Sequence, residues 1–256
     1  MKRFIGYAIA AAFIAITVVY TAAALGASAE TRRASGCAGI RIIIADSLKN
    51  NIVTQDEVLS FLGGNTAEYL GKPIEDIDLK KIEEKVNGQS AILKSEAYVT
   101  KDGLLNIEIT QRTPVIRLGS VYSDASGYLF PVREGYPADV PEAEGRIPLK
   151  ITAGYKGEAR TAEERQWVKG MLSLVSYIGS NRRDMRGFRK ISVRENGDLV
   201  LHPDGEAVQF IFGQPDEIAK KFKKIRLYYT KIVPEKGAET YSSVNLKYDG
   251  QIICRK

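Results

Sequence analysis

The sequence predicts an α+β protein with a single N-terminal transmembrane helix and two further domains, the second of which contains an antiparallel sheet. A long uncharged stretch opens the 256-residue chain. The composition, with 44% hydrophobic and 27% charged residues, is that of an ordinary globular protein. Beyond the uncharged stretch, amphipathic helical patterns and short β-branched runs fall into two groups, and the proline-rich segment 119–160 forms a looped entry to the second group.

The uncharged stretch, residues 4–26, is assigned to the transmembrane helix. Residues 5–25 are apolar or small apart from Thr17, Thr21 and two tyrosines. As a helix these 21 residues would span about 31 Å, close to the roughly 30 Å hydrocarbon core of a bilayer. Tyr7 and Tyr20 lie near its ends, where aromatic side chains favour the headgroup region. The alternative is a cleaved signal peptide, since 27–29 resembles a cleavage site, but the apolar run exceeds the usual length of about 7–15 residues.

Flanking charges do not decide the orientation, because two basic residues lie on each side of the span. A very short head before a single span is typical of an uncleaved signal anchor. We therefore expect a cytoplasmic tail at 1–3 and a linker at 27–39 on the opposite side of the membrane. The chain has 37 Lys and Arg residues against 31 Asp and Glu residues. This basic surplus would then lie outside the cytoplasm, so no nucleic-acid partner is expected.

The first domain is predicted at 40–116 with the order strand, helix, helix, strand, strand. A β-branched run opens it as a buried strand. Thr54 and Glu57 form a capping box at the start of the first helix, and Asp78 caps the second. Alternating apolar residues at 97–109, interrupted by a Lys-Asp-Gly turn, predict the last two strands.

The second domain is predicted at 117–256. A capping box at Thr161 opens a strongly amphipathic helix, and Asn196-Gly197 is a hairpin signal between two strands. Pro215 lies in the first turn of a later helix that carries a basic run at 220–226. We interpret this run as a solvated face, with a surface for an acidic partner as the alternative. A closing strand is expected from Tyr241 towards Cys254.

The sequence offers little support for an enzyme. It has one histidine, no G-x-S-x-G and no S-x-x-K, so nucleophilic hydrolases and penicillin-binding acyltransferases are disfavoured. His202 lies in a turn-like sequence and is expected to be solvated. Cys37 and Cys254 are too few for a cysteine zinc site. They are expected to stay unpaired because they lie at opposite ends of two domains in series. We expect no catalytic, cofactor-binding or metal-binding residues.

The tail 244–250 reads Val-Asn-Leu-Lys-Tyr-Asp-Gly. It is similar to the hydrophobic-D-L-R-Y-x-x-G close of the FtsQ β domain, with Asn245 and Lys247 in place of Asp and Arg. The chain therefore resembles the FtsQ/DivIB family of cell-division proteins, most closely in the Bacteroidetes type. The resemblance implies a POTRA domain at 40–116 and an FtsQ-type β domain at 117–256. The segments that resemble the POTRA domain are Asp46–Leu48, Asn51–Val53, Ile77–Val86 and Glu108–Pro114.

This resemblance implies a noncatalytic, single-pass scaffold of the bacterial divisome in the inner membrane at the septum, with a cytoplasmic N-terminus and a periplasmic C-terminus. It further implies FtsB-like and FtsL-like partners, other divisome components, and control of septal peptidoglycan synthesis, without a small-molecule substrate or cofactor. The alternative is an envelope chaperone or transport component that uses a POTRA domain. Such a protein would normally have several POTRA repeats or a following barrel.

The terminal strand is the predicted partner-binding site. A last strand tends to lie at a sheet edge, where an incoming strand can pair with its free backbone groups. We expect a partner strand along 243–253. Ile252 and Ile253 are consecutive, so at most one of them can face the core of an alternating strand. Lys247 keeps the positive charge of arginine but loses its planar fork. The predicted contact residues are Lys247, Tyr248, Gly250, Gln251, Ile252 and Ile253.

Overall fold

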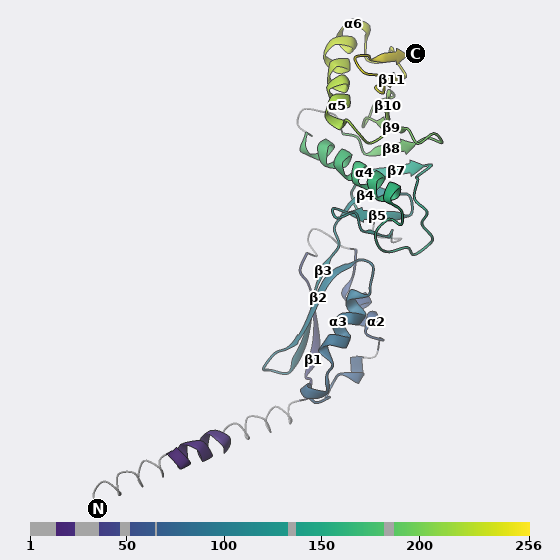
Figure 1. Ribbon diagram of the computed structural model, residues 1–256. Coiled ribbons are helices and arrows are strands. Elements are labelled where there is room, and N and C mark those ends of the chain that lie inside the picture. The colour runs from purple at the N-terminus through teal and green to yellow at the C-terminus, as the bar shows by residue number, and fades with distance from the viewer. Residues whose placement is uncertain (1–13, 24–35, 47–51, 65, 133–136, 182–186) are drawn as a thin grey trace, which may run out of the picture. The chain divides into compact units, whose positions relative to one another are not determined.

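The computed structural model describes residues 14–23, 36–46, 52–64, 66–132, 137–181 and 187–256 (Figure 1). The chain forms two compact units that divide after Gln111, and Ile52 groups with the second unit. The sequence places this boundary at residue 116. The structure places it earlier because β4 (Pro114–Leu118) pairs with strands of the second unit.

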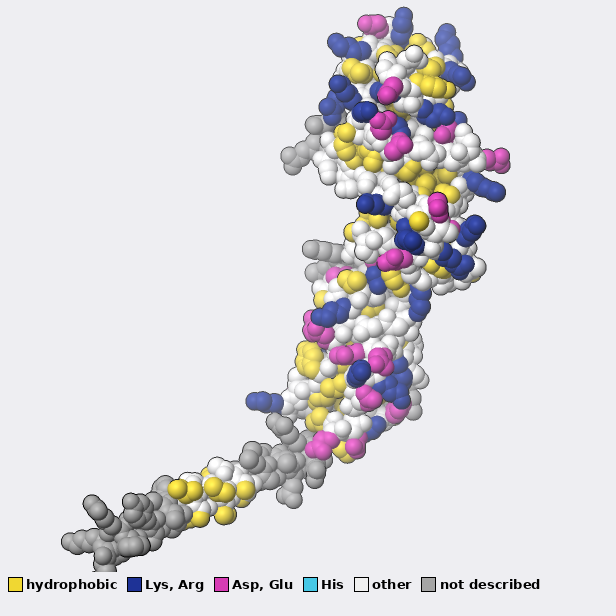
Figure 2. Space-filling view, viewed as in Figure 1, with side chains coloured by type: hydrophobic (Ala, Val, Ile, Leu, Met, Phe, Trp, Pro, Cys, Tyr) yellow, Lys and Arg dark blue, Asp and Glu magenta, His cyan; other side chains and the backbone are white. Residues whose placement is uncertain are grey.

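The N-terminal segment is helical over residues 14–23, and the side chains of this helix are exposed (Figure 2). No helix in the described part of the chain has both the length and the apolar character needed to cross a membrane. The rest of the expected span 4–26, the expected tail 1–3 and residues 27–35 of the expected linker lie outside the described residues. The transmembrane assignment therefore stays a prediction.

The first unit contains a three-stranded sheet in the order β1-β3-β2, with β1 parallel to β3 and β2 antiparallel to it. Two 3₁₀ turns, Thr66–Glu68 and Ile74–Asp76, lie between its helices. The predicted order of strand, helix, helix, strand, strand is confirmed. The elements are β1 (Gly39–Ile44), α2 (Gln55–Phe61), α3 (Leu79–Asn87), β2 (Ile92–Val99) and β3 (Leu104–Gln111).

Both helices of this unit begin at the capping residues that the sequence predicts. The Thr54 side chain accepts a hydrogen bond from the amide of Glu57, and the Glu57 carboxylate accepts one from the amide of Thr54 at 2.9 Å. The Asp78 carboxylate caps α3 through the amide of Lys81, also at 2.9 Å. The apolar side chains that these helices and β3 bury together are Val58, Ile82, Val86, Leu105, Ile107 and Ile109.

The second unit is built on a nine-stranded sheet in the order β12-β11-β10-β9-β8-β7-β4-β5-β6. Helix α4 (Ala162–Ser180) precedes β8, and α5 (Ile218–Leu227) precedes β11. A π-helical turn, Tyr228–Ile232, and α6 (Val233–Lys236) continue α5. The strands are β4, β5 (Val121–Asp124), β6 (Leu129–Pro131), β7 (Glu142–Gly145), β8 (Lys190–Val193), β9 (Leu199–His202), β10 (Gln209–Gly213), β11 (Ser243–Asn245) and β12 (Ile253–Arg255).

The expected antiparallel sheet is wrong in part, because the sheet is mixed. The pairs β4–β7, β7–β8 and β10–β11 are parallel, whereas the other pairs are antiparallel. Parallel neighbours need a crossover between them. Helix α4 lies in the connection from β7 to β8, and α5 with α6 lies in the connection from β10 to β11. The hairpin signal at Asn196-Gly197 joins β8 to β9 as predicted, and Gly197 has a φ of +82°.

The two ends of this sheet differ. At one end, Leu129 of β6 forms a two-way bridge with Gly157: its amide donates at 2.8 Å to the Gly157 carbonyl, and the Gly157 amide donates back at 3.0 Å. Pro131, the last residue of β6, has no amide hydrogen to offer. At the other end lies β12, which pairs with β11 alone among the described strands.

Aromatic and aliphatic side chains fill the core of the second unit. The capping box at Thr161 is formed, and α4 buries the predicted stripe that includes Trp167 and Met171. Helix α5 adds Phe222, whose ring lies 5.6 Å from that of Phe212 and 5.8 Å from that of Phe188. This packing fixes α5 against the strands that lead to the C-terminal hairpin.

His202 is not in a solvated turn as expected; it is the last residue of β9 and is half-buried. The strand ends at His202, immediately before the Pro-Asp-Gly turn at 203–205. Its Nε2 lies 2.9 Å from the hydroxyl of Ser192 on the neighbouring strand β8. Burial lowers the pKa of this imidazole and the charge of Lys190 lowers it further, while Glu144 opposes both.

Candidate partner-binding edge

The C-terminal hairpin, β11 and β12, forms one end of the nine-stranded sheet. Strand β11 pairs in parallel with β10 and antiparallel with β12, so Val244 lies opposite both Phe210 and Cys254. The expected single strand along 243–253 is therefore wrong, because residues 246–252 form a loop between two short strands. Since both sides of β11 are occupied, β12 is the strand at this end of the sheet that can offer unpaired backbone groups within the described part of the chain.

Local hydrogen bonds explain why the chain leaves the strand after Asn245. The Asn245 side chain accepts a hydrogen bond from the amide of Lys247 at 3.0 Å, which is an Asx turn. The Gln251 amide then donates to the Tyr248 carbonyl at 3.4 Å across a second turn. Gly250, the third residue of this turn, has a φ of +67°, a conformation that favours glycine. The amide of Gln251 is thus used inside the loop.

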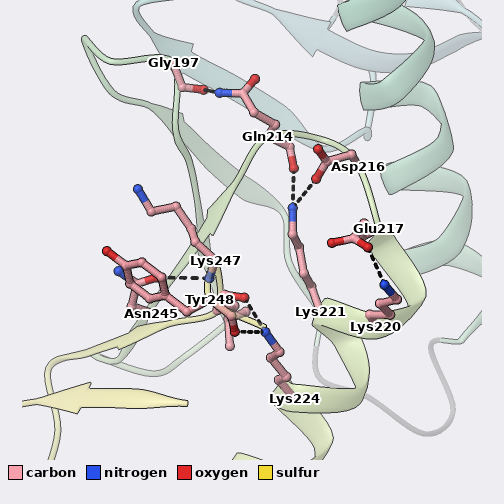
Figure 3. A network of polar contacts seen from close by, with 11 residues as sticks. Gly197, Gln214, Asp216, Glu217, Lys220, Lys221, Lys224, Asn245, Lys247 and Tyr248 are labelled. Atoms are coloured by element: carbon pink, nitrogen blue, oxygen red, sulfur yellow. Dashed lines mark hydrogen bonds and ion pairs between the residues drawn. The ribbon is translucent and has the colours of Figure 1, made fainter. Parts of the chain in front are cut away.

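Lys224 of α5 anchors this loop (Figure 3). Its ammonium donates to the carbonyl of Leu246 at 2.8 Å and also to the carbonyl of Tyr248. With its backbone held in this way, the Tyr248 side chain stays 52% exposed. The predicted aromatic anchor is therefore presented to solvent from a loop that is fixed to a packed helix.

Lys247 contacts a carboxylate of its own chain. Its ammonium lies 2.7 Å from Oδ2 of Asp198, a residue that is only 7% exposed. Burial acts to raise the pKa of Asp198, but hydrogen bonds from Lys247 and Asn196, with the nearby basic charges, outweigh it and hold the pKa below its ordinary value. A Cβ at Gly213, where φ is +80°, would lie 2.9 Å from Cγ of Lys247. A contact of Lys247 with a partner stays a prediction.

The end of the chain alternates as a strand should. Ile252 and Cys254 pack against the core of the second unit, and Ile253 lies between them in sequence and is half-buried. Both cysteines carry free thiols: Cys37 is buried in the first unit, and Cys254 lies in β12 of the second. Burial raises the pKa of the Cys254 thiol, which keeps it in the less reactive protonated form.

The basic run 220–226 is not uniformly solvated. Lys221 is buried, donates to the carbonyl of Gln214 at 2.8 Å and to the carboxylate of Asp216, and lies 4.8 Å from the ring centre of Phe212 (Figure 3). Burial of the lysine stem with a paired ammonium makes this residue part of the core. Lys220 forms an ion pair with Glu217 on the surface.

Sequence reasoning did not find the two residues that position the predicted site, Lys224 and Asp198. Lys224 lies 22 residues before the first carbonyl that it binds, and Asp198 lies 49 residues before Lys247. No local pattern connects residues so far apart. The residues of β12 beyond Ile253, including exposed Arg255, were also outside the predicted set because the strand was expected to lie earlier.

Chemically, the arrangement is suited to binding. An edge strand offers backbone donors and acceptors, and the exposed Tyr248 in the loop between β11 and β12 offers a rigid apolar surface. Within the residues that the structure describes, no group of three or more His, Cys, Asp or Glu side chains is placed to hold a metal ion.

Comparison with known proteins agrees with this architecture. Residues 113–255 match a family model described as FtsQ/DivIB, C-terminal related, and residues 35–110 match a model of a POTRA-like domain. Cell division protein FtsQ of Paracoccus denitrificans (strain Pd 1222) is 26% identical over 215 residues, which cover 77% of this chain and 58% of that relative. The match thus spans little more than half the length of the relative. Because the first model covers more than half of the chain, the chain belongs to the FtsQ/DivIB family.

Proposed function

We propose that this chain is a noncatalytic, membrane-anchored scaffold of the bacterial divisome. In this proposal residues 4–26 cross the inner membrane once, residues 1–3 are cytoplasmic, and both folded units lie in the periplasm at the septum. The scaffold links early and late division proteins and regulates septal peptidoglycan synthesis through FtsB-like and FtsL-like partners. Family membership and the FtsQ relative support the role in division.

The observation that carries the proposal is the open side of β12 at the end of the nine-stranded sheet. An FtsB-like partner adds a strand there, along Ile253–Arg255, and uses the exposed ring of Tyr248 as an anchor. Backbone pairing supplies affinity in such complexes, and side chains beside the strand supply specificity. Strand addition along Ser243–Asn245 is not proposed, because β11 already has two neighbours.

Photo-crosslinking in cells tests this proposal. A photoreactive amino acid at Arg255, which is exposed on β12, should give an adduct with an FtsB-like protein, whereas the same group at Lys169, exposed on α4, should not. Tyr248→Ala should weaken pull-down of that partner about 30-fold, the equivalent of about 2 kcal/mol for a lost aromatic anchor. Adducts at both positions, or at neither, would refute the edge model.

A depletion experiment tests the wider role. Loss of a division scaffold should give filamentous cells with unchanged outer-membrane proteins. Loss of an envelope chaperone should instead reduce outer-membrane proteins while division continues. The second result would refute the proposed divisome role.

A further inference from the structure

One face of α5 carries exposed Lys and Arg side chains that form no ion pair with the described residues. Between Glu217 and Glu235 the helix contains no acidic residue. Lys221 and Lys224 bind groups of their own chain, as described above. Exposed Lys223, Arg226 and Lys231, in contrast, have no ion-pair partner among the described residues. Figure 2 shows Lys and Arg side chains gathered over the end of the second unit that holds α5 and α6.

These cations surround an exposed leucine. Lys223 lies three and four residues before Arg226 and Leu227, and Lys231 follows in the π-helical turn; all four side chains are exposed, whereas Phe222 and Ile225 are buried. We call this set of four the cationic α5 face. Leu227 is 41% exposed. Among the described residues of 112–256, Leu227 and Tyr248 are the large hydrophobic side chains that the fold leaves exposed.

The cationic α5 face borders the loop of the proposed binding edge. Lys224 lies one turn before Leu227, and its ammonium holds the carbonyl of Tyr248 (Figure 3). The two exposed hydrophobic residues of this unit therefore flank the same lysine. Lys224 thus ties the helix that carries the cationic α5 face to the loop that joins β11 and β12.

We propose that the cationic α5 face docks an acidic segment of a partner protein, with an apolar side chain of that segment packed on Leu227. Complementary charge steers such a segment and fixes its orientation. An anionic membrane fits less well, because a helix that lies on a membrane inserts an apolar face, and the apolar face of α5 is buried in the core. The inference rests on the proposed function only in taking the partner to be a division protein.

A binding experiment on the full chain in phosphatidylcholine nanodiscs tests the charge requirement. The probe is a labelled synthetic peptide of glutamates with leucine at every fourth position, compared with the same peptide carrying glutamine for glutamate. The variant K223Q/R226Q/K231Q should bind the acidic peptide at least tenfold more weakly, and Leu227→Ala about threefold more weakly. The charge-matched control K150Q/K156Q/K169Q should change binding less than twofold. Equal binding by the wild-type chain and the first variant would overturn the proposal.

Two further measurements separate the alternatives. Vesicles containing phosphatidylglycerol should bind the chain equally well with and without K223Q/R226Q/K231Q; loss of vesicle binding in that variant, with unchanged peptide binding, would assign the face to lipid and overturn the proposal. In cells, a photo-crosslinker at residue 227 should capture a segment rich in Asp and Glu. If it does not, while the crosslinker at 255 still captures its partner, this inference fails and the proposed function stands. If both positions fail, the proposed function fails as well.

Discussion

Replacing Lys247 by methionine tests how the C-terminal loop is tied to the β8–β9 hairpin. Methionine keeps an aliphatic stem beside Gly213 but removes the ammonium that lies 2.7 Å from Asp198. The carboxylate of Asp198, whose side chain is 10% exposed, would then keep the hydrogen bond from the side-chain amide of Asn196 at 3.0 Å and the more distant charge of Arg194. The substitution therefore leaves a nearly buried charge with one contact fewer.

The structure sets the size of the effect. Exposed ion pairs contribute about 0–1 kcal/mol, whereas stranding one partner of a fully buried pair costs about 3–5 kcal/mol. This pair lies between the two cases, because the Lys247 side chain is 33% exposed and that of Asp198 is 10% exposed. We expect Lys247→Met to lower the free energy of unfolding of the second unit by about 2 kcal/mol at pH 7.

Urea unfolding of the full chain, followed by tryptophan fluorescence, provides the assay. Trp167 is the single tryptophan and is buried in the second unit, so its signal reports that unit. A double-mutant cycle that combines Lys247→Met, Asp198→Asn and the double variant should give an interaction free energy of about 1–2 kcal/mol between the two side chains. If Lys247→Met lowered the free energy of unfolding by less than about 0.3 kcal/mol at pH 7, the reasoning would be refuted. A difference that small lies within the scatter found for changes that do not interact.

The pH dependence gives a second check on the same pair. The pKa of folded Asp198 is lowered, so the ionised form is favoured by folding. The stabilisation is therefore complete above the unfolded pKa of about 3.9 and is lost as the pH falls through the lowered value. The difference between the wild-type chain and Lys247→Met should stay constant from neutral pH down to about pH 5 and shrink below about pH 4. A difference that persists undiminished in acid would contradict the ion-pair explanation.

Three other predictions follow from single contacts. Gly145→Ala should destabilise the second unit by about 3 kcal/mol in thermal unfolding, because φ is +99° and the new Cβ would overlap the Val193 carbonyl oxygen; a change under about 1 kcal/mol would contradict this. Glu164→Gln should lower the free energy of unfolding by about 1–3 kcal/mol at pH 7, because the carboxylate accepts hydrogen bonds from the backbone amides of Lys150, Arg160 and Thr161. These hydrogen bonds lower the pKa of Glu164, so the destabilisation should fade as the pH falls through that lowered pKa. His202, the one histidine, should titrate by NMR below the ordinary pKa of about 6.5, so folding stability should fall as the pH drops from about 6.5 through the lowered value; a normal or raised pKa would contradict the dominant effect of burial.

Local chemistry accounts for the parts of the fold that the sequence predicts. The capping boxes at Thr54 and Thr161 and the hairpin at Asn196-Gly197 each depend on residues within a few positions of one another. The parallel pairing of β10 with β11 could not be predicted in this way, because it depends on where α5 and α6 return the chain. The mixed sheet is a property of the crossovers, which have no local signature.

The candidate site likewise combines features that the local sequence predicts with features that depend on distant residues. The exposed Tyr248 and the turn at Gly250 lie in the segment that the sequence singles out. The split of the terminal strand depends on an Asx turn at Asn245 and on hydrogen bonds from the distant Lys224. A buried Lys221 within a basic run is equally hidden, since only its position beside Phe222 on the helix relates it to the core.

The unlike ends of the large sheet limit how many copies can join. The β6 end is closed by the Leu129–Gly157 bridge and by Pro131, while the β12 end is open. Edge-to-edge growth of a sheet into a filament requires two compatible open edges on each molecule. Two copies that each have one open edge can pair with each other, after which neither copy has an open edge left. Strand addition at β12 would therefore have a valency of one, and a partner bound there would also shield the edge that could otherwise start aggregation.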